Sequence, residues 1–382
     1  MKKTAEVVVI GGGISGAPIA YYLAKKGVKN VVLLEKNFIA SGATGRSAAG
    51  IRSQYGTEMN CIISKFSCDI LEHAQEELEY DGDLELVQGG YLMLASTEKE
   101  REQFIKNIAL QNSLGIESVM LSVEETKELV PFLNTEGLLC SAFHQKDGHM
   151  NPFHTTQAYI DAAKRLGVEV YTYTEVTDVV VENGRVTGVK TNKGDIATNI
   201  VVNAAGGWSQ KIGQMAGVDL PLYSERHQIL VTEPIEEILK PMVLSFSLNM
   251  YCKQVPHGGI LMGRGDETEP RDLRMSSSWQ FLDEVAKTIT HLMPPLKNVR
   301  MLRQWAGLYN MSPDRQPIYG PVDEVAGFYV AAGFSGHGFH FGPATGIIIS
   351  EYILGEKLTL PVEGLTLNRF KEGRLIFEPN VV

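Results

Sequence analysis

Residues 5–35 read AEVVVIGGGISGAPIAYYLAKKGVKNVVLLE and decide the fold of the first part of the chain. The short, β-branched apolar run at 5–10 predicts a buried strand. Residues 14–26 have the spacing of an amphipathic helix and end at Gly27, a residue suited to a helix C-cap. Residues 31–35 predict a second, parallel strand, so the segment is a βαβ unit with an expected right-handed crossover.

The turn between the first strand and the helix is rich in glycine, and Gly11, Gly13 and Gly16 match the pattern GxGxxG. The first glycine permits a tight turn, the second lets the backbone approach a pyrophosphate, and the third lets helix and strand pack closely. The helix starting near Ile14 points its N-terminus at the phosphate, and Glu35 ends the second strand where an acid binds ribose hydroxyls. The combination predicts a dinucleotide site and disfavours NADP; the alternative is a tight βα turn without a ligand.

The composition is that of a globular protein, with 44% of the 382 residues hydrophobic and 21% charged. The net charge of −10 argues against nucleic acid and anionic membranes as partners. Four cysteines without CxxC spacing argue against a disulfide scaffold and against structural zinc. No apolar run approaches a membrane span, and Glu6 with the glycines at 11–13 interrupts any signal-peptide pattern, so a cytoplasmic protein is expected.

Elsewhere, hydrophobic periodicity and turn residues predict helices and strands along the whole chain. The expected helices are 57–80, 97–113, 122–129, 152–166, 276–293 and a last one that follows a glycine-rich turn at 333–338 and ends near 354. Strands are expected within 84–95, around Gly89-Gly90, and at 168–172, 176–182, 185–191, 196–203, 222–233, 241–265, 297–309 and 327–331. Because βαβ material lies at both ends and in the middle, two interleaved domains are expected.

The segment ASGATGRSAAG at 40–50 follows the ribose-binding acid and is small, polar and rich in glycine. An NAD site rarely needs such a segment, whereas a flavin extends past the pyrophosphate and requires a second loop around its ribityl chain and ring. Hydroxyls, backbone N–H groups and one cation for that role come from Ser41, Gly42, Thr44, Arg46 and Ser47. FAD is therefore the expected cofactor, and a flexible surface loop is the alternative.

Taken together, these segments resemble the D-amino-acid oxidase superfamily of FAD-dependent amine oxidoreductases, in particular sarcosine oxidases, glycine oxidase and the β subunits of sarcosine oxidase and L-proline dehydrogenase. The resemblance covers essentially the whole chain. Its further marks are SGATGRSAAGIR, DGHMNPFHTTQAYIDAAKRLGVEV, VVNAAGGWS, WAGLYNMSPDRQPIYGP and YVAAGFSGHGFHFGPATG. It implies an α/β fold in which a glutathione-reductase-like, Rossmann-type FAD domain (1–83, 145–222 and 312–382) is interleaved with a substrate domain (84–144 and 223–311) on a mixed, largely antiparallel sheet.

The resemblance also implies that FAD is held without a covalent bond by residues from the whole length of the chain. They are Gly11, Gly13, Ile14, Ser15, Gly16, Glu35, Lys36, Ser41, Gly42, Thr44, Arg46, Ser47, Ala49, Gly50, Val176, Ala205, Gly206, Trp208, Gly307, Gly333, Gly336, His337, Gly338, Phe339 and His340. Val176 is expected near the adenine, and Gly307 with residues 333–339 near the isoalloxazine. The N-terminus of the last helix would stabilise negative charge at flavin N1–C2=O.

Four residues are candidates for the substrate site. Arg52, in GIRSQYG, matches an arginine that holds the substrate carboxylate in single-chain sarcosine oxidases, and a guanidinium can form two parallel hydrogen bonds to a carboxylate. Tyr251 matches a substrate-contacting tyrosine, and His227, in SERHQILV, lies on a strand expected to face the flavin. A surface or phosphate-facing arginine, a half-buried strand tyrosine and a core histidine are the alternatives. His340 stands where those oxidases have a lysine, and a weaker, pH-dependent cation is expected there.

Two further departures from the family bear on the reaction. Glycine oxidase has an arginine after WAGL where this chain has Tyr309, which counts against free glycine as the substrate. Eleven residues after the matched tyrosine, sarcosine oxidases have a lysine that promotes the reaction with O2, where this chain has Met262. The resemblance therefore implies oxidation of the C–N bond of a secondary or N-methyl amino acid, such as L-proline or sarcosine, by hydride transfer to flavin N5 in a dehydrogenase rather than a strict oxidase.

Other readings stay open at this point. The chain could be a flavin-carrying electron-transfer or scaffold subunit, active only within a hetero-oligomer, or a glycine or D-amino-acid oxidase, or an NAD-dependent dehydrogenase. An α subunit or a homo-oligomer are the candidate assemblies. His154, in NPFHTTQAY, matches the segment where heterotetrameric sarcosine oxidase carries FMN, so two interpretations are open there: local packing at the start of a helix, and FMN at a subunit interface. No metal is expected, although His144, His149 and His154 are evenly spaced.

Overall fold

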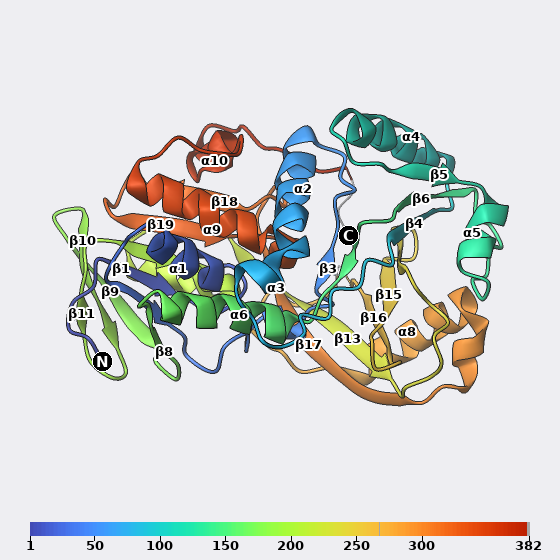
Figure 1. Ribbon diagram of the computed structural model, residues 1–382, viewed down its shortest axis with the longest axis horizontal. Helices are drawn as coiled ribbons and strands as arrows, with labels where there is room; N and C mark the ends of the chain where they lie inside the picture. The colour runs from blue at the N-terminus through green and yellow to red at the C-terminus, as the bar shows by residue number, and fades with distance from the viewer. Residues whose placement is uncertain (267, 380–382) are drawn as a thin grey trace.

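Two large β-sheets lie side by side in the computed structural model, and the helices pack against them (Figure 1). The structure describes residues 1–266 and 268–379. The chain passes several times from one half of the molecule to the other, so each half combines segments that are distant in sequence. A ligand bound between the halves would therefore contact residues from many parts of the chain.

The first sheet has six strands in the order β18-β19-β12-β1-β2-β8, and its neighbours are parallel except for β18 and β19. Its strands are β1 (Val7–Ile10), β2 (Val31–Leu34), β8 (Glu169–Tyr171), β12 (Val201–Asn203), β18 (Ile318–Pro321) and β19 (Phe328–Ala332). Every position of β1 and β2 is buried, which explains why these strands are unbroken apolar runs rather than alternating ones.

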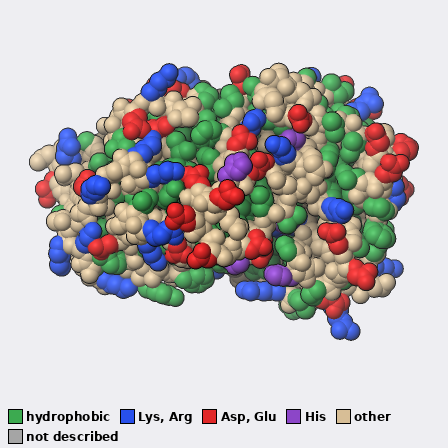
Figure 2. All heavy atoms as spheres, viewed as in Figure 1, with side chains coloured by type: hydrophobic (Ala, Val, Ile, Leu, Met, Phe, Trp, Pro, Cys, Tyr) green, Lys and Arg blue, Asp and Glu red, His purple; other side chains and the backbone are tan. Residues whose placement is uncertain are grey.

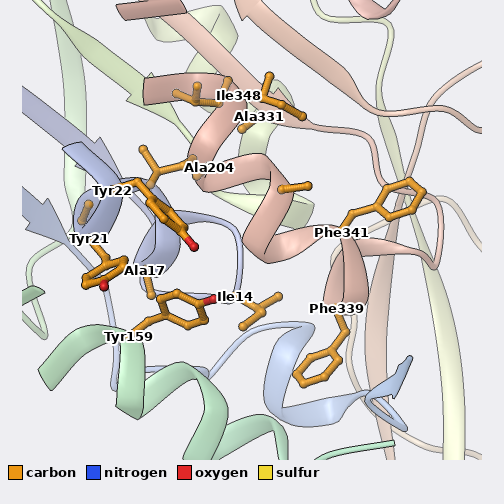
Figure 3. Close-up of a cluster of buried hydrophobic side chains, with 14 of the residues drawn as sticks. Ile14, Ala17, Tyr21, Tyr22, Tyr159, Ala204, Ala331, Phe339, Phe341 and Ile348 are labelled. Carbon is orange, nitrogen blue, oxygen red and sulfur yellow. The ribbon is translucent and has the colours of Figure 1, made fainter. Parts of the chain in front are cut away.

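A layer of helices covers one face of this sheet. It contains α1 (Gly16–Lys25), α6 (Pro152–Arg165) and α9 (Gly338–Leu354), and α2 (Glu58–Glu72) packs against α9. Figure 3 shows the core beneath this layer, where Tyr21 and Tyr22 of α1 lie beside Tyr159 of α6. The other face of the sheet is covered by α7 (Ser209–Met215) and by an antiparallel meander of β9 (Val176–Glu182), β10 (Arg185–Thr191) and β11 (Ile196–Ala197).

The second sheet has eight strands in the order β17-β13-β16-β15-β14-β4-β6-β5, and only β14 and β4 pair in parallel. Its strands are β4 (Tyr91–Ala95), β5 (Val119–Leu121), β6 (Cys140–His144), β13 (Tyr223–Thr232), β14 (Met242–Ser245), β15 (Met250–Gln254), β16 (Ile260–Arg264) and β17 (Met301–Met311). Its back packs on α8 (Trp279–Leu292), and its front faces the other half of the molecule. Helices α4 (Glu98–Ser113) and α5 (Val123–Leu129) lie at the β4-β6-β5 end.

The remaining elements are short. Strands β3 (Gly50–Ile51) and β7 (Gly148–His149) form a two-stranded ladder at the junction of the halves. The others are α3 (Ala74–Glu77), α10 (Asn368–Lys371) and the 3-10 turns η1 (Thr44–Arg46), η2 (Gly206–Trp208), η3 (Pro294–Asn298) and η4 (Glu363–Leu365).

The predicted α/β class, with a parallel Rossmann-like sheet and a mixed, mostly antiparallel second sheet, is confirmed. The predicted helix at 57–80 is divided at His73, whose φ of −108° and ψ of 4° depart from helical values. Of the strands predicted around Gly89-Gly90 within 84–95, the structure has β4 after the glycines and a single β-bridge of Val87 with His149 before them, and Gly90 turns the chain with a positive φ of 90°. The proposed domain boundaries stay a prediction. The division of the strands between the two sheets is compatible with them.

The surface and the buried residues agree with a globular chain. Acidic and basic side chains are interspersed over the face shown in Figure 2. Within residues 1–266 and 268–379, no helix is both long enough and apolar enough to cross a membrane. All four cysteines are buried and carry free thiols.

Candidate active site

An elongated cavity extends from the glycine turn after β1 to the front of the eight-stranded sheet. All the predicted cofactor residues line it except Gly16 and Gly333. The predicted substrate residues Arg52, His227 and Tyr251 line it too. The fold therefore brings the candidate residues from both ends and the middle of the sequence to one site.

The two exceptions shape the backbone beside the cavity. A Cβ atom on Gly16 would overlap the carbonyl oxygen of Gly11, so glycine is what allows α1 to pack closely against the turn after β1. Gly333 follows β19 with a positive φ of 79°, and a Cβ there would lie 2.9 Å from the Leu222 side chain. The close packing predicted for Gly16 is thus present, and a direct contact of either glycine with the cofactor stays a prediction.

The carboxylate of Glu35 organises the glycine turn at the end of β2. Its Oε2 accepts a hydrogen bond from Gly12 N (2.8 Å), and its Oε1 accepts hydrogen bonds from Asn37 N (2.8 Å) and Ser41 Oγ (3.3 Å). The residue is only 9% exposed, so this charge is held by backbone and hydroxyl donors. Glu35 thereby ties the 40–50 segment to the turn.

The 40–50 segment also contacts the start of α1. Thr44 Oγ1 accepts a hydrogen bond from Ile14 N (3.1 Å), so the hydroxyl predicted to serve a cofactor also satisfies a backbone donor of the turn. On another side of the cavity, Lys36 Nζ lies 3.2 Å from the centroid of the Trp208 ring. Burial lowers the pKa of Lys36, and the aromatic face offers its cation a partial replacement for water.

The backbone of the cavity wall fits a flat cofactor such as FAD. A Cβ atom on Gly307 would come within 3.1 Å of Arg46 Cβ, and one on Gly336 within 3.1 Å of the Tyr309 ring, so glycine keeps the wall open at both places. Helix α9 begins at the cavity. The bond from Phe341 N to His337 O (3.3 Å) is at its first turn, and the N–H groups of residues 338–340 come before it in the chain. A helix N-terminus of this kind favours negative charge.

Three aromatic rings from different strands stack on the sheet side of the cavity. The rings of His227 (β13) and Tyr309 (β17) are parallel within 4°, with centroids 4.3 Å apart, and His227 and Tyr251 (β15) stack at 5.6 Å and 11°. His227 Nε2 and Tyr251 Oη share a hydrogen bond of 3.0 Å. Tyr251 reaches across β16 because Gly263 has no side chain, and a Cβ there would overlap the tyrosine ring.

These rings are uncharged near neutral pH. Burial lowers the pKa of His227 to about 4, and burial raises the pKa of Tyr309 to about 12. The stack therefore presents polar edges and aromatic faces without a net charge. A neutral wall of this kind disfavours a charged group that binds against it.

Arg52 carries a positive charge into the same cavity. The residue is 6% exposed, and its guanidinium carbon lies 4.5 Å from the centroid of the Tyr55 ring and 5.9 Å from that of Tyr91. Burial alone would lower the pKa of Arg52, but Tyr55, Tyr91 and Glu378 outweigh that effect and raise it. A permanently charged guanidinium in a desolvated setting is suited to a carboxylate.

Sequence reasoning missed Tyr55, which lies three residues after Arg52 and lines the cavity. Tyr55 Oη and His340 Nε2 share a hydrogen bond of 2.6 Å, and the His340 ring also bonds the backbone of Gly50. Burial, together with the charge of Arg52 and the neighbouring His337, lowers the pKa of His340 well below its usual value. His340 is therefore neutral and does not supply the pH-dependent cation expected from the sequence.

Contrary to the expectation from its match to the lysine that promotes the reaction with O2 in sarcosine oxidases, Met262 does not lie at the cavity. In the ladder between β15 and β16, Tyr251 pairs with Gly263 and Cys252 pairs with Met262. Met262 lies in the core under α8, on the opposite face from Tyr251, so its lack of charge says nothing about a reaction at the cavity. The basic residue on the Tyr251 face of β15 is Lys253, which is 4% exposed and whose pKa burial lowers to about 7.

The evenly spaced histidines do not meet. His154 Nδ1 hydrogen-bonds Asp83 O (2.6 Å), and His144 Nδ1 lies 2.9 Å from an oxygen of Asp147. Among the residues that the structure describes, no three His, Cys, Asp or Glu side chains form a group that could hold a metal ion. The surroundings of His154 are those of local packing at the start of α6.

Three of the other lining residues that were missed are apolar and lie on the eight-stranded sheet. Ile229, Met242 and Leu244 project from the front of the eight-stranded sheet into the cavity. Strand periodicity could have identified this face once the register was known, because alternate residues such as Leu230 and Val243 lie in the back core.

A family model described as "FAD dependent oxidoreductase" (DAO) matches residues 6–352. Sarcosine oxidase subunit beta of Rhodobacter capsulatus is 32% identical over 384 residues, which cover 99% of this chain and 91% of that protein. Human mitochondrial sarcosine dehydrogenase is 30% identical over 97% of this chain, but the match spans 42% of the human protein.

Among solved structures, L-proline dehydrogenase from P. horikoshii superposes with a TM-score of 0.94 and 40% identity, covering 98% of this chain and all of that one. Glycine oxidase from Geobacillus kaustophilus superposes with a TM-score of 0.89 at 24% identity, covering 96% of this chain and 99% of that chain, a likeness that supports the fold alone. None of these findings supports FMN near His154.

Proposed function

This chain belongs to the DAO family of FAD-dependent oxidoreductases, and from that premise we propose that it oxidises the C–N bond of a secondary or N-methyl amino acid of the L-proline or sarcosine type. The broader description is established by the family and its close relatives: the chain is an FAD-dependent amino acid oxidoreductase acting on CH–NH bonds. The substrate class and the role of each residue are what the proposal adds.

One arrangement carries the proposal. The charged Arg52 and the uncharged stack of His227, Tyr251 and Tyr309 line the same cavity as the cofactor residues. We assign the substrate carboxylate to Arg52, because its planar guanidinium can donate two parallel hydrogen bonds. The amine would lie against the neutral stack, where burial favours its unprotonated form, the form from which a hydride can leave.

The apolar part of the site favours a secondary amine over free glycine. Ile229, Met242 and Leu244 offer hydrocarbon surface on the front of the eight-stranded sheet. An N-methyl group or the methylenes of a pyrrolidine ring would remove that surface from water, which glycine cannot do.

The residues around the rest of the cavity would hold FAD. Glu35 would bind ribose hydroxyls, the turn at 11–15 the pyrophosphate, and Gly307 with the 336–340 segment the ring system. When bound, FAD accepts the hydride from the carbon next to the amine nitrogen. The N-terminus of α9 would favour the negative charge that follows on the pyrimidine side.

We further propose dehydrogenase rather than strict oxidase activity, on the strength of the relatives named L-proline dehydrogenase and sarcosine dehydrogenase. A second candidate is a flavin-carrying subunit that works only within a hetero-oligomer with an α subunit. It is favoured by relatives that are named as subunit beta.

Anaerobic reduction of the purified yellow protein separates these candidates. L-Proline or sarcosine should bleach the visible absorbance of the flavin, and sulfate or glycine should not. Subsequent air should restore the colour slowly, whereas an artificial electron acceptor should restore it fast. No bleaching with any amino acid would favour the subunit candidate, and fast stoichiometric release of H2O2 would refute the dehydrogenase assignment.

A further inference from the structure

Arg52 and Tyr55 lie in the loop that joins β3 to α2, and the first half of this loop is held from inside the fold. Ser53 N and Gln54 Nε2 donate hydrogen bonds to the two carboxylate oxygens of Asp147, at 2.8 and 3.2 Å. These bonds fix the backbone on either side of residue 53. The part of the loop after Tyr55 is held by other contacts.

The second half of the loop is held by the C-terminal segment of the chain. Glu378 is 7% exposed; its Oε1 accepts a hydrogen bond from Gly56 N (2.7 Å), and its Oε2 accepts hydrogen bonds from Thr57 Oγ1 (2.8 Å) and Asn60 Nδ2 (2.9 Å). Thr57 is the N-cap residue of α2, but its own side chain does not cap the helix. The carboxylate of Glu378 supplies the negative charge that this helix end favours.

Two polar interactions fix the segment that carries Glu378. Ile376 N donates a hydrogen bond to Asp314 Oδ2 (3.3 Å), and Asp314 forms a buried ion pair with Arg369 of α10 (2.8 Å). In Figure 1 the segment runs from α10 across the end of α2 toward α4. Gly56 allows the close contact, because a Cβ atom there would overlap Pro379.

The charge of Glu378 also acts on the two cavity residues of the loop. Burial is the largest influence on both: it lowers the pKa of Arg52 and raises that of Tyr55. Glu378 raises the pKa of each, so it favours the charged guanidinium beside the neutral phenol. Gln111 Nε2 adds a hydrogen bond to Tyr55 O (2.7 Å) from α4.

We propose that Glu378 is a positioning residue for carboxylate recognition: by holding residues 56–60, it keeps Arg52 and Tyr55 in the arrangement that binds the substrate carboxylate. The inference rests on the proposed function, since it takes the substrate to be an amino acid. It gives the C-terminal segment control over substrate affinity without contact with the substrate.

The test compares Glu378→Gln with the wild type as full-length, FAD-loaded proteins. Glutamine keeps the size of the side chain but replaces one acceptor oxygen by a donor, so it cannot accept the bond from Gly56 together with those from Thr57 and Asn60. Tetrahydrofuran-2-carboxylate serves as a probe with a carboxylate, and pyrrolidine as a probe without one, both titrated through the flavin absorbance. The matched control is Glu372→Gln, since Glu372 lies on the same segment and pairs only with Arg374 among the described residues.

Glu378→Gln should lower the affinity for the carboxylate probe by about tenfold, because a small displacement of a binding group has an effect of this order. The affinity for pyrrolidine should stay within about twofold of the wild-type value. The KM of the amino acid substrate should rise by a factor similar to that for the carboxylate probe, with kcat nearly unchanged. Equal weakening of both probes, or affinities equal to those of the Glu372→Gln control, would overturn the inference.

If Glu378→Gln fails to retain FAD, Thr57→Val serves as a second variant, because it removes a single hydrogen-bond donor. It should lower the affinity for the carboxylate probe alone, by a few-fold. The inference is also overturned if Thr57→Val shows no such selective loss. A wild-type protein that binds neither probe and is reduced by no amino acid would instead count against the proposed function. The two failures are thus distinguishable.

Discussion

Replacement of Lys253 by methionine should stabilise the protein at neutral pH, by an amount that falls as the pH rises. Lys253 lies on β15 and is 4% exposed, and its Nζ forms no hydrogen bond or ion pair with any residue in the described part of the chain. Burial lowers its pKa from 10.5 to about 7, although Glu85 opposes the shift. The folded protein therefore disfavours the charged form that the unfolded chain prefers.

The magnitude follows from that shift, since each pKa unit corresponds to about 1.4 kcal/mol. Because the folded pKa lies below the unfolded one, the unfolded chain binds more protons between these two values, and stability rises with pH across that window. The cost of the lysine is complete below about pH 7, where it amounts to about 5 kcal/mol, and vanishes above its unfolded pKa. Methionine has a similar shape and carries no such cost.

The assay is urea unfolding of the FAD-loaded wild type, of Lys253→Met, and of the control Lys106→Met on the exposed side of α4. The advantage of Lys253→Met over the wild type should shrink by about 1.4 kcal/mol for each pH unit between about pH 7 and about pH 9. The control should show no such slope. An advantage that is independent of pH, or a destabilised variant at neutral pH, would refute the reasoning.

Three substitutions probe the cavity itself. Arg52→Lys should raise the KM for the amino acid by about tenfold in steady-state kinetics, because lysine cannot present two parallel donors; an unchanged KM would contradict the role given to Arg52. Tyr55→Phe should cost about 1–3 kcal/mol in thermal unfolding, because it leaves a buried nitrogen of His340 without its partner. Gly263→Ala should push Tyr251 from its place and slow anaerobic flavin reduction without loss of FAD, which stopped-flow absorbance can separate.

Most residues predicted for the cofactor line one cavity, and there is a physical reason why the sequence could locate them. Gly11, Gly13 and Glu35 belong to one short βαβ unit, whose backbone geometry is local and whose residue types are narrowly limited by a pyrophosphate and a ribose. The fold class follows from the same unit and from the strand pattern around it. Gly16 and Gly333 show the limit of this reasoning, because glycine is required both for contact with a ligand and for contact between chain segments.

The substrate half depends on register, which local patterns do not determine. Counting residues from Tyr251 placed Met262 in the cavity, yet the hairpin between β15 and β16 puts it on the opposite face. A shift of one residue in a strand exchanges its two faces, so an alignment across a hairpin fails in this way. Tyr55 and Glu378 were missed because their importance lies in partners far away in sequence, His340 for one and residues 56–60 for the other.

The strand order of the two sheets has a consequence for how the chain folds during synthesis. The eight-stranded sheet needs β16 and β17 beside β13, and the six-stranded sheet needs β18 and β19 beside β12. Neither sheet can be completed by a ribosome that has made only the first two-thirds of the protein. The nascent chain must keep the edge of β12 unpaired until β19 has been made, which slows folding and makes that apolar edge a natural target for chaperones.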